Sequence, residues 1–238
     1  MYALLDWDNS LRSGATLFTW TDYLVEKGIL SPGVVDERKE LQARYRRGEF
    51  SHDDLSRECC VSYLRAMDGM EESRYQALLR DYFPKDRHNL APHTPVLMAW
   101  LRQRGITPVV VSGSPHDVIE GYFAEFGVKH SHDFLTRITD GRVDGSFLCS
   151  GGHDKQSVVT LCQEQFGEAP VLAAGDSSSD LPMLEAARFP IVIGTDEAMH
   201  RRFPDAPTIT CTPEGADAMD AYLRRCGEIL DAEGSAAP

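Results

Sequence analysis

The sequence has few basic residues, no long apolar run and no CxxC motif, and each of these absences excludes a class of protein. Its 24 Lys and Arg stand against 37 Asp and Glu, which gives a formal net charge of −13. Such acidity argues against nonspecific binding to nucleic acid or to an anionic membrane, because both require a basic surface. No apolar stretch approaches the roughly 20 residues of a membrane span. The six cysteines lack CxxC spacing, so we interpret them as reduced, mostly buried thiols of a cytoplasmic protein.

The amino-acid composition is that of an ordinary globular protein. The 238 residues are 42% apolar and 26% charged, enough to bury a large core, in one domain or in a core with a smaller companion. The first apolar run, at residues 3–5, is predicted to be a strand, so we expect no cleaved signal peptide.

Residues 16–83 are predicted to be helical. Apolar residues recur at helical spacing over residues 16–27, and Ser51 followed by Asp54 is typical of a capping box at the start of a helix. The last helix of this segment is expected to end before Pro84, because proline interrupts helices. Four helices without an intervening strand indicate a helical insertion after the first strand.

After Pro92 the pattern changes to strands alternating with helices. Strands are predicted at residues 107–111, 171–174, near 191 and near 208, with helices from Thr94, Pro115 and Asp154 and a hairpin turning at Asp140–Gly141. This alternation predicts an α/β fold with a doubly wound, mostly parallel, Rossmann-like sheet. We expect an α/β core at residues 1–13 and 89–228, the small helical domain formed by the insertion at 14–88 and a disordered tail at 229–238.

Two carboxylates, Asp6 and Asp8, follow the first predicted strand. Side chains alternate along a strand, so both leave on one side and Trp7 on the other. Ligands bind outside the carboxyl ends of parallel strands, and a carboxylate is a competent nucleophile toward phosphorus. Taken alone, the pair is equally compatible with an Asp-rich turn or a helix cap.

Three further sites follow in the chain. Ser112 and Gly113 come after the second core strand and would offer a hydroxyl and an unhindered N–H to a phosphate, although a capped helix start explains the same residues. Lys155 opens a helix and opposes its dipole, so an anion nearby would explain it, although a solvated surface charge is the simpler interpretation. Asp176 and Asp180 follow another strand; carboxylates there suit Mg²⁺, and an Asx turn or N-cap is compatible with the same pattern.

These motifs, in this order, resemble the haloacid dehalogenase-like superfamily, and more narrowly its phosphoserine-phosphatase-like branch with a helical cap after the first strand. The resemblance rests on Asp6-Trp-Asp-Asn-Ser10, on the strand ending in Ser112-Gly113, on Lys155, and on Gly175-Asp176 with Asp180. It covers nearly the whole chain.

The resemblance implies a role for each residue. Asp6 would attack phosphorus to form an aspartyl phosphate, and Asp8 would protonate the leaving oxygen and then activate water. Asp6, the backbone carbonyl of Asp8 and Asp176 would hold Mg²⁺, with Asp180 in support. The phosphoryl oxygens would be bound by Ser112 and Gly113, and their charge offset by Lys155.

The sequence departs from the branch at several positions. Ser179 stands where relatives often carry Asn, and Ala15 stands where phosphoserine phosphatases place a Glu that binds the substrate ammonium. Arg57 loosely matches an arginine that binds the substrate carboxylate, but an exposed helix arginine is an equal alternative. Phe18 and two aromatic residues after it, Trp20 and Tyr23, could line an aromatic pocket, although their spacing is more typical of the cap interior.

We therefore expect a cytoplasmic, Mg²⁺-dependent phosphomonoester hydrolase acting on a small phosphorylated metabolite, with no nucleic-acid or membrane partner. The pocket is not expected to favour phosphoserine, and a neutral or larger alcohol phosphate fits better. Two alternatives remain: a phosphotransferase using the same aspartyl phosphate, and a noncatalytic phosphate-binding or phospho-signalling domain.

Overall fold

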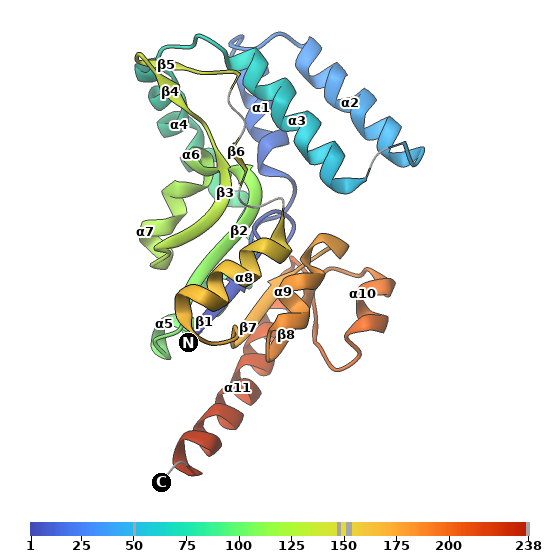
Figure 1. Cartoon of the computed structure of the whole chain (residues 1–238), viewed down its shortest axis with the longest axis vertical. Helices are drawn as coiled ribbons and strands as arrows, with labels where there is room; N and C mark the ends of the chain where they lie inside the picture. Colours follow the sequence, from blue (N-terminus) through green and yellow to red (C-terminus); the bar gives the residue numbers. More distant parts are fainter. Residues whose placement is uncertain (50, 147–148, 151–153, 237–238) are drawn as a thin grey trace.

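A computed structural model of the chain describes residues 1–49, 51–146, 149–150 and 154–236. Its centre is a seven-stranded sheet in the order β6-β3-β2-β1-β7-β8-β9, parallel except for the β3–β6 pair (Figure 1). The strands are β1 (Tyr2–Leu5), β2 (Thr107–Pro115), β3 (His130–Leu135), β6 (Cys149–Ser150), β7 (Leu172–Gly175), β8 (Phe189–Ile193) and β9 (Thr208–Ile209). The α/β class and mostly parallel sheet predicted from the sequence are confirmed.

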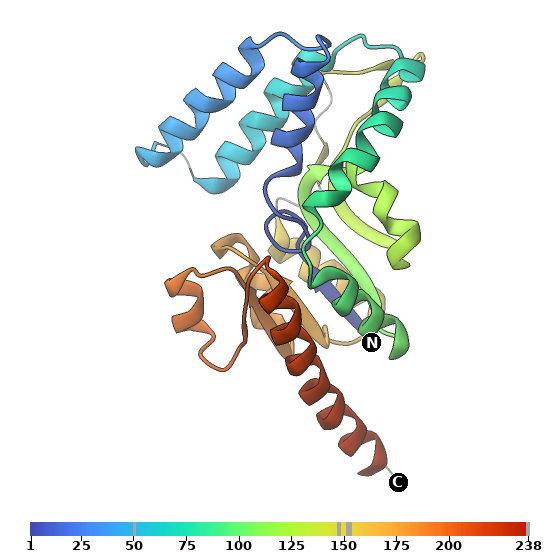
Figure 2. The ribbon, with the colours of Figure 1, turned by 180° about the vertical axis from the view of Figure 1, so that it is seen from behind.

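Helices cover both faces of the sheet. Figure 1 shows α8 (Lys155–Phe166) and α9 (Leu181–Ala186) in front of it, and Figure 2 shows α5 (Thr94–Gln103) and α11 (Pro213–Ala236) on the other side. The remaining helical elements after α5 are α6 (His116–Ile119), α7 (Phe123–Phe126), α10 (Glu197–Arg202) and the short 3₁₀ turns η2 (Glu120–Tyr122) and η3 (Ser178–Asp180). In a sheet covered on both faces by helices, ligands bind in the crevice at the carboxyl ends of the strands.

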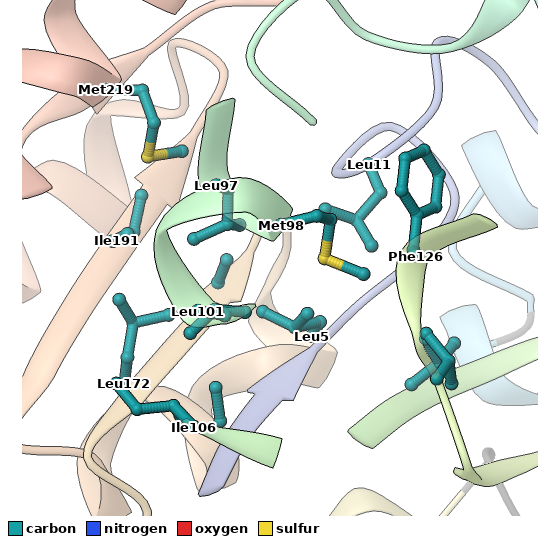
Figure 3. Packing of buried hydrophobic residues seen from close by; sticks show 14 of the residues in the cluster. Leu5, Leu11, Leu97, Met98, Leu101, Ile106, Phe126, Leu172, Ile191 and Met219 are labelled. Carbon is teal, nitrogen blue, oxygen red and sulfur yellow. The ribbon is translucent and has the colours of Figure 1, made fainter. Parts of the chain in front are cut away.

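Alternation along β1 divides its side chains between two cores. Ala3 and Leu5 enter the cluster under α5 and α11 (Figure 3), whereas Leu4 enters the cluster under α8 and α9. Trp7 is buried in the first cluster, so the carboxylates on either side of it are directed away from that core. The predicted separation of Trp7 from the acidic pair is confirmed.

Four helices follow β1 without an intervening strand, as predicted: α1 (Thr16–Glu26), α2 (Gly33–Arg46), α3 (His52–Met67) and α4 (Glu72–Asp86), the last continued by η1 (Arg87–Asn89). Their apolar faces share a core around Trp20 and Tyr63, to which Val118 of α6 and Phe134 of β3 also contribute, and which is distinct from the two clusters around β1. The capping box of Ser51 and Asp54 at the start of α3 is confirmed. The expected end before Pro84 is wrong, because α4 continues through Pro84 to Asp86.

Two linkers join this helical segment to the sheet, and they are held together side by side. The amide of Ser13 donates to the carbonyl of Asn89 at 2.8 Å, and the amide of Ala91 donates to the carbonyl of Leu11 at 3.0 Å. We therefore keep residues 14–88 as the proposed extent of the cap.

A buried ion pair connects the two linkers. Arg12 is 0% exposed and Asp86 is 2% exposed; the Arg12 Nη2 lies 2.5 Å from Asp86 Oδ1, and its Nε lies 3.2 Å from Oδ2. Asp86 also accepts from Tyr82, Asn89 and Tyr122. These bonds anchor the last turn of α4, which explains why the helix survives the proline two residues before it.

The structure corrects the prediction at the carboxyl end of the chain. Residues 229–236 were expected to be disordered but belong to α11. Ion pairs from the body of the protein hold this part of the helix: Arg104 binds Asp231 at 2.9 Å, and Arg188 binds Glu233 at 2.6 Å. Residues 237 and 238 lie outside the described part of the chain.

The predicted hairpin is confirmed. The hairpin of β4 (Ile138–Thr139) and β5 (Arg142–Val143) turns at Asp140 and Gly141, both with positive φ, as a tight type I′ hairpin requires. The five cysteines whose side chains are described are free, and four of them are buried. No helix in the described ranges is long and apolar enough to cross a membrane.

We expect Asp86→Ala to lower the free energy of unfolding by about 3–5 kcal/mol, because it leaves the Arg12 charge buried without its partner. Urea unfolding measures the loss. The matched control is Glu125→Ala, which breaks the exposed pair between Glu125 and Arg87 and should cost at most about 1 kcal/mol. Equal small losses in both variants would contradict the role given to the buried pair.

Candidate active site

The predicted motifs meet at the carboxyl ends of the three central strands. Because β1 pairs with β2 on one side and β7 on the other, the residues that follow these strands converge. They border a cavity of about 230 Å³ lined by Asp6, Asp8, Asn9, Ala15, Leu17, Phe18, Leu55, Ser56, Cys59, Ser112, Gly113, Lys155, Asp176, Ser177 and Ser179. The cavity therefore lies between the sheet and helices α1 and α3.

A buried lysine lies between two carboxylates at the floor of this cavity. Lys155, the first residue of α8, is 7% exposed. Its Nζ donates to Asp6 Oδ1 at 2.7 Å and also to Asp180 Oδ1. Burial alone would lower the pKa of Lys155, but the charges of Asp180 and Asp6 raise it above its usual value. Because Lys155 is buried between two carboxylates, the interpretation of Lys155 as a solvated surface charge is wrong.

Asp180 organises the loop after β7. Its Oδ2 accepts from the amides of Asp176 and Ser177 at 3.0 and 2.9 Å. A Cβ on Gly175 would lie 2.4 Å from the Cβ of Asp180, so the glycine at the strand end makes room for this carboxylate. Both oxygens of Asp180 are thus occupied by protein donors, which supports the Asx-type turn and places Asp180 beside Asp6 and Asp176.

Asp6, Asp176 and Asp180 form a cluster in which one oxygen of each lies within 4.8 Å of the others. Burial raises the pKa of Asp6 to about 7, against the opposing charge of Lys155. Burial, together with the charges of Asp6 and Asp180, raises the pKa of Asp176 to about 8. When all three carboxylates are ionised, the single ammonium of Lys155 leaves an excess of negative charge.

This cluster fits a hard divalent cation. All of its ligand atoms are carboxylate oxygens, which Mg²⁺ prefers, and Mg²⁺ commonly binds through one or two protein carboxylates with water and phosphate completing its shell. Asp6 and Asp176 are the carboxylates available for this, because the oxygens of Asp180 are bonded to Lys155 and to backbone amides.

Asp8 lies outside the cluster and is held by different donors. Its Oδ1 accepts from the amide and the hydroxyl of Thr16, at 2.9 and 2.5 Å, and its Oδ2 accepts from Ser114 Oγ at 2.7 Å. Burial raises the pKa of Asp8 above its usual value, although these hydrogen bonds oppose the rise. Two neighbouring carboxylates of one motif are thus placed in separate environments.

Sequence reasoning missed Thr16 and Ser114. Thr16 is the first residue of α1 and also accepts from the indole N–H of Trp7 at 3.1 Å, so the start of the first cap helix is bonded to Trp7 and Asp8 together. Ser114 could not be found from a strand period, because the predicted strand ended at Val111 and the register against β3 shifts after that residue.

The Ser112 and Gly113 segment differs in detail from the prediction. The strand was expected to end at Val111, but β2 continues to Pro115, with a register shift against β3 after Val111. α6 begins at His116 with Pro115 as its N-cap, so no helix begins at the proline. Ser112 Oγ accepts from the amide of Ser114 at 3.1 Å and lines the cavity with Gly113.

The cap residues divide into those that reach the cavity and those that do not. Arg57 is exposed on α3 and is not among the cavity-lining residues, although its neighbour Ser56 is. Trp20 and Tyr23 are buried in the cap interior, at 0% and 6% exposure. Phe18 lines the cavity, so one of the three aromatic candidates borders the site. Ser179 also lines it, with its Oγ 2.8 Å from Ser177 Oγ.

Comparison with known proteins identifies the family. Residues 3–185 match the model of the haloacid dehalogenase-like hydrolases, so the chain belongs to this family. The hydrolase class and the resemblance predicted from the sequence are confirmed. No curated protein matches the sequence.

Solved structures support the same fold. A protein of unknown function from Bordetella pertussis Tohama I has 19% identity and a TM-score of 0.73, over 89% of this chain and 98% of that one. A phospho-aspartyl intermediate analogue of phosphoserine phosphatase has 15% identity and a TM-score of 0.62, over 89% and 93%. Cytosolic 5′-nucleotidase IIIB bound to cytidine has 15% identity and a TM-score of 0.65, over 97% and 87%. At these identities the likeness establishes the fold alone.

We expect Mg²⁺ to raise the melting temperature more at about pH 8.5 than at about pH 6. In the folded, metal-free protein the pKa of Asp6 is raised to about 7 and that of Asp176 to about 8. At a pH between the ordinary pKa of an aspartate and these raised values, the folded protein therefore binds more protons than the unfolded chain. The metal-free protein therefore loses stability as the pH rises through this range, and the cation must displace protons at the lower pH.

Differential scanning fluorimetry with and without Mg²⁺ at both pH values checks this expectation. Asp176→Asn is the matched control and should lose most of the shift caused by Mg²⁺ at the higher pH. A shift of equal size at both pH values, or one that survives in Asp176→Asn, would place the cation elsewhere.

Proposed function

We propose that this protein is a Mg²⁺-dependent phosphomonoester hydrolase that acts on a small phosphorylated metabolite through an aspartyl phosphate on Asp6. The observation that carries the proposal is that Asp6 and Asp8 have different hydrogen-bond partners. Asp6 is paired with Lys155 beside Asp176, whereas Asp8 accepts hydrogen bonds from Thr16 and Ser114. A nucleophile and a proton donor require such different environments.

The first half-reaction follows from these positions. An Asp6 oxygen attacks phosphorus and forms a P–O bond while the bond from phosphorus to the ester oxygen breaks. The departing oxygen takes the proton of Asp8, so an alcohol leaves and Asp8 becomes a carboxylate. Burial of Asp8 favours the protonated form that this step needs.

The second half-reaction reverses the proton transfer. The Asp8 carboxylate removes a proton from water, the water oxygen attacks phosphorus, and the bond between phosphorus and Asp6 breaks to release phosphate and restore Asp8 as an acid. Thr16 and Ser114 orient the Asp8 carboxyl in both steps.

The charges around the phosphoryl group are balanced by the core. Lys155 is held by Asp6 and Asp180 and would offset the phosphate charge, and Ser112 with Gly113 would bind the phosphoryl oxygens from β2. A magnesium ion held by Asp6 and Asp176 would neutralise the repulsion between a carboxylate and a phosphate dianion.

The comparisons and the cysteines support the proposal. Two of the similar structures are those of a phosphoserine phosphatase and a 5′-nucleotidase, and the chain belongs to a hydrolase family. A cytoplasmic location stays part of the proposal and is supported by the free thiols among the described cysteines.

We expect Asp6→Asn to abolish release of inorganic phosphate, because the amide is nearly isosteric but is not a nucleophile. Asp8→Asn should lower kcat by about 10²–10⁴-fold, the usual loss when a general acid-base group is removed. Release from a panel of phosphorylated metabolites with Mg²⁺ measures both effects, and a chelator should stop the wild-type reaction reversibly.

Asp220→Asn serves as the matched control, because Asp220 pairs with Arg224 on the exposed side of α11 and does not line the cavity. It should keep wild-type activity. All variants should retain the wild-type melting temperature closely enough to exclude unfolding, and undiminished turnover by Asp6→Asn would refute the mechanism.

A further inference from the structure

The two walls of the cavity differ in chemistry. The charged groups among its described lining residues, Asp6, Asp8, Lys155 and Asp176, come from the core. The opposite wall, here named the cap wall, comes from the start of α1 and from α3 and consists of Ala15, Leu17, Phe18, Leu55, Ser56 and Cys59. Burial raises the pKa of Cys59 to about 11, so its thiol is neutral. Within the described residues, the cap wall offers a substrate no charged partner.

Phe18 is the largest side chain of the cap wall, and Arg38 holds it in place. The Arg38 guanidinium lies 4.8 Å from the centroid of the Phe18 ring. It also donates to the Phe18 carbonyl at 3.0 Å and to Asp22 Oδ1 at 2.8 Å. Arg38 borders a small separate hollow behind Phe18 and does not line the catalytic cavity. Its charge is therefore paired with Asp22 and is not part of the cavity lining.

The volume of the cavity favours a small substrate. At about 230 Å³ it is smaller than the roughly 300–1,000 Å³ of pockets that enclose drug-sized ligands. The phosphoryl group occupies the core side, beside Lys155, so a few heavy atoms of the leaving group remain to contact the cap wall.

We propose, on the basis of the phosphatase function above, that the leaving group is a small, uncharged and largely apolar alcohol that packs against Phe18. A charged leaving group would lose its hydration at the cap wall and find no partner there. A site with no partner for a charge discriminates strongly against it, whereas an apolar chain of the same length gains by burial. Specificity in this enzyme thus comes from the cap wall and phosphate binding from the core.

Three esters of nearly equal length test the proposal: n-butyl phosphate, 3-aminopropyl phosphate and the phosphate ester of 3-hydroxypropanoate. The wild-type kcat/KM for n-butyl phosphate should exceed that for each charged ester by on the order of 100-fold, the loss expected for an unpaired buried charge. A charged ester that is used as well as n-butyl phosphate would overturn the proposal.

Two variants at Ala15 give a matched test. Ala15 is the N-cap of α1, has an extended backbone and makes no side-chain cap, so a longer side chain is compatible with its conformation. Ala15→Glu should shift the ratio of kcat/KM for 3-aminopropyl phosphate over n-butyl phosphate upward by about 10-fold or more, whereas Ala15→Gln should leave the ratio unchanged. A change at Ala15 that disturbs Asp8 would alter the hydrolysis of both esters alike, so it would not change the ratio of their kcat/KM values.

The outcomes distinguish the uncharged leaving group from the phosphatase function on which it rests. Hydrolysis of the esters without preference, or equal ratios in Ala15→Glu and Ala15→Gln, would overturn the uncharged leaving group while the phosphatase function stands. No Mg²⁺-dependent hydrolysis of any ester, p-nitrophenyl phosphate included, would overturn the phosphatase function and this inference with it. Phe18→Ala adds a further check: it should lower the preference for n-butyl over methyl phosphate, and Phe18→Leu should retain it.

Discussion

The buried contact of Lys155 with Asp6 and Asp180 is the interaction on which the rest of the site depends. One fixed ammonium allows two carboxylates to remain close together in a buried pocket, where removing either partner would leave an uncompensated charge. The contact also joins three parts of the chain, because Lys155 begins α8, Asp6 follows β1 and Asp180 closes the loop after β7. The absence of a side chain at Gly175 makes room for Asp180. The sheet order brings these strand ends together, and the ammonium fixes where each carboxylate lies.

A second constraint connects the cap to the chemistry. The first helix of the cap begins with Thr16, whose amide and hydroxyl both bond to Asp8, so the proposed acid-base residue is positioned by the element that also forms the cap wall. The two linkers at the base of the cap are held together by the buried pair of Arg12 and Asp86. Because the same segment bears Phe18 on α1, we infer that the position of the cap sets both the proton donor and the contact with the leaving group.

The sequence predicted the site best where two rules apply: side chains alternate along a strand, and ligands bind at the carboxyl ends of parallel strands. Asp6, Asp8 and Asp176 could be placed at one edge of the sheet, since parallel strands end on the same side. Interactions between distant segments were not predictable. The continuation of α4 through Pro84 depends on bonds to Asp86 from other elements, and the helix at residues 229–236 depends on arginines far away in sequence. Asp8 acquires its partners from two other elements for the same reason, and a loose motif match could not reveal that Arg57 lies outside the cavity.

The central claim is that Asp6 receives the phosphoryl group. A crystal structure of the protein grown with Mg²⁺ and beryllium fluoride tests it most directly, because trifluoroberyllate imitates a phosphoryl group on a carboxylate. The account predicts a fluoroberyllate bonded to the Asp6 carboxylate, with Lys155 contacting it and Mg²⁺ bound by Asp6 and Asp176. The account would be contradicted if the fluoroberyllate or the cation were bound to other residues and Asp6 kept only its ion pair with Lys155.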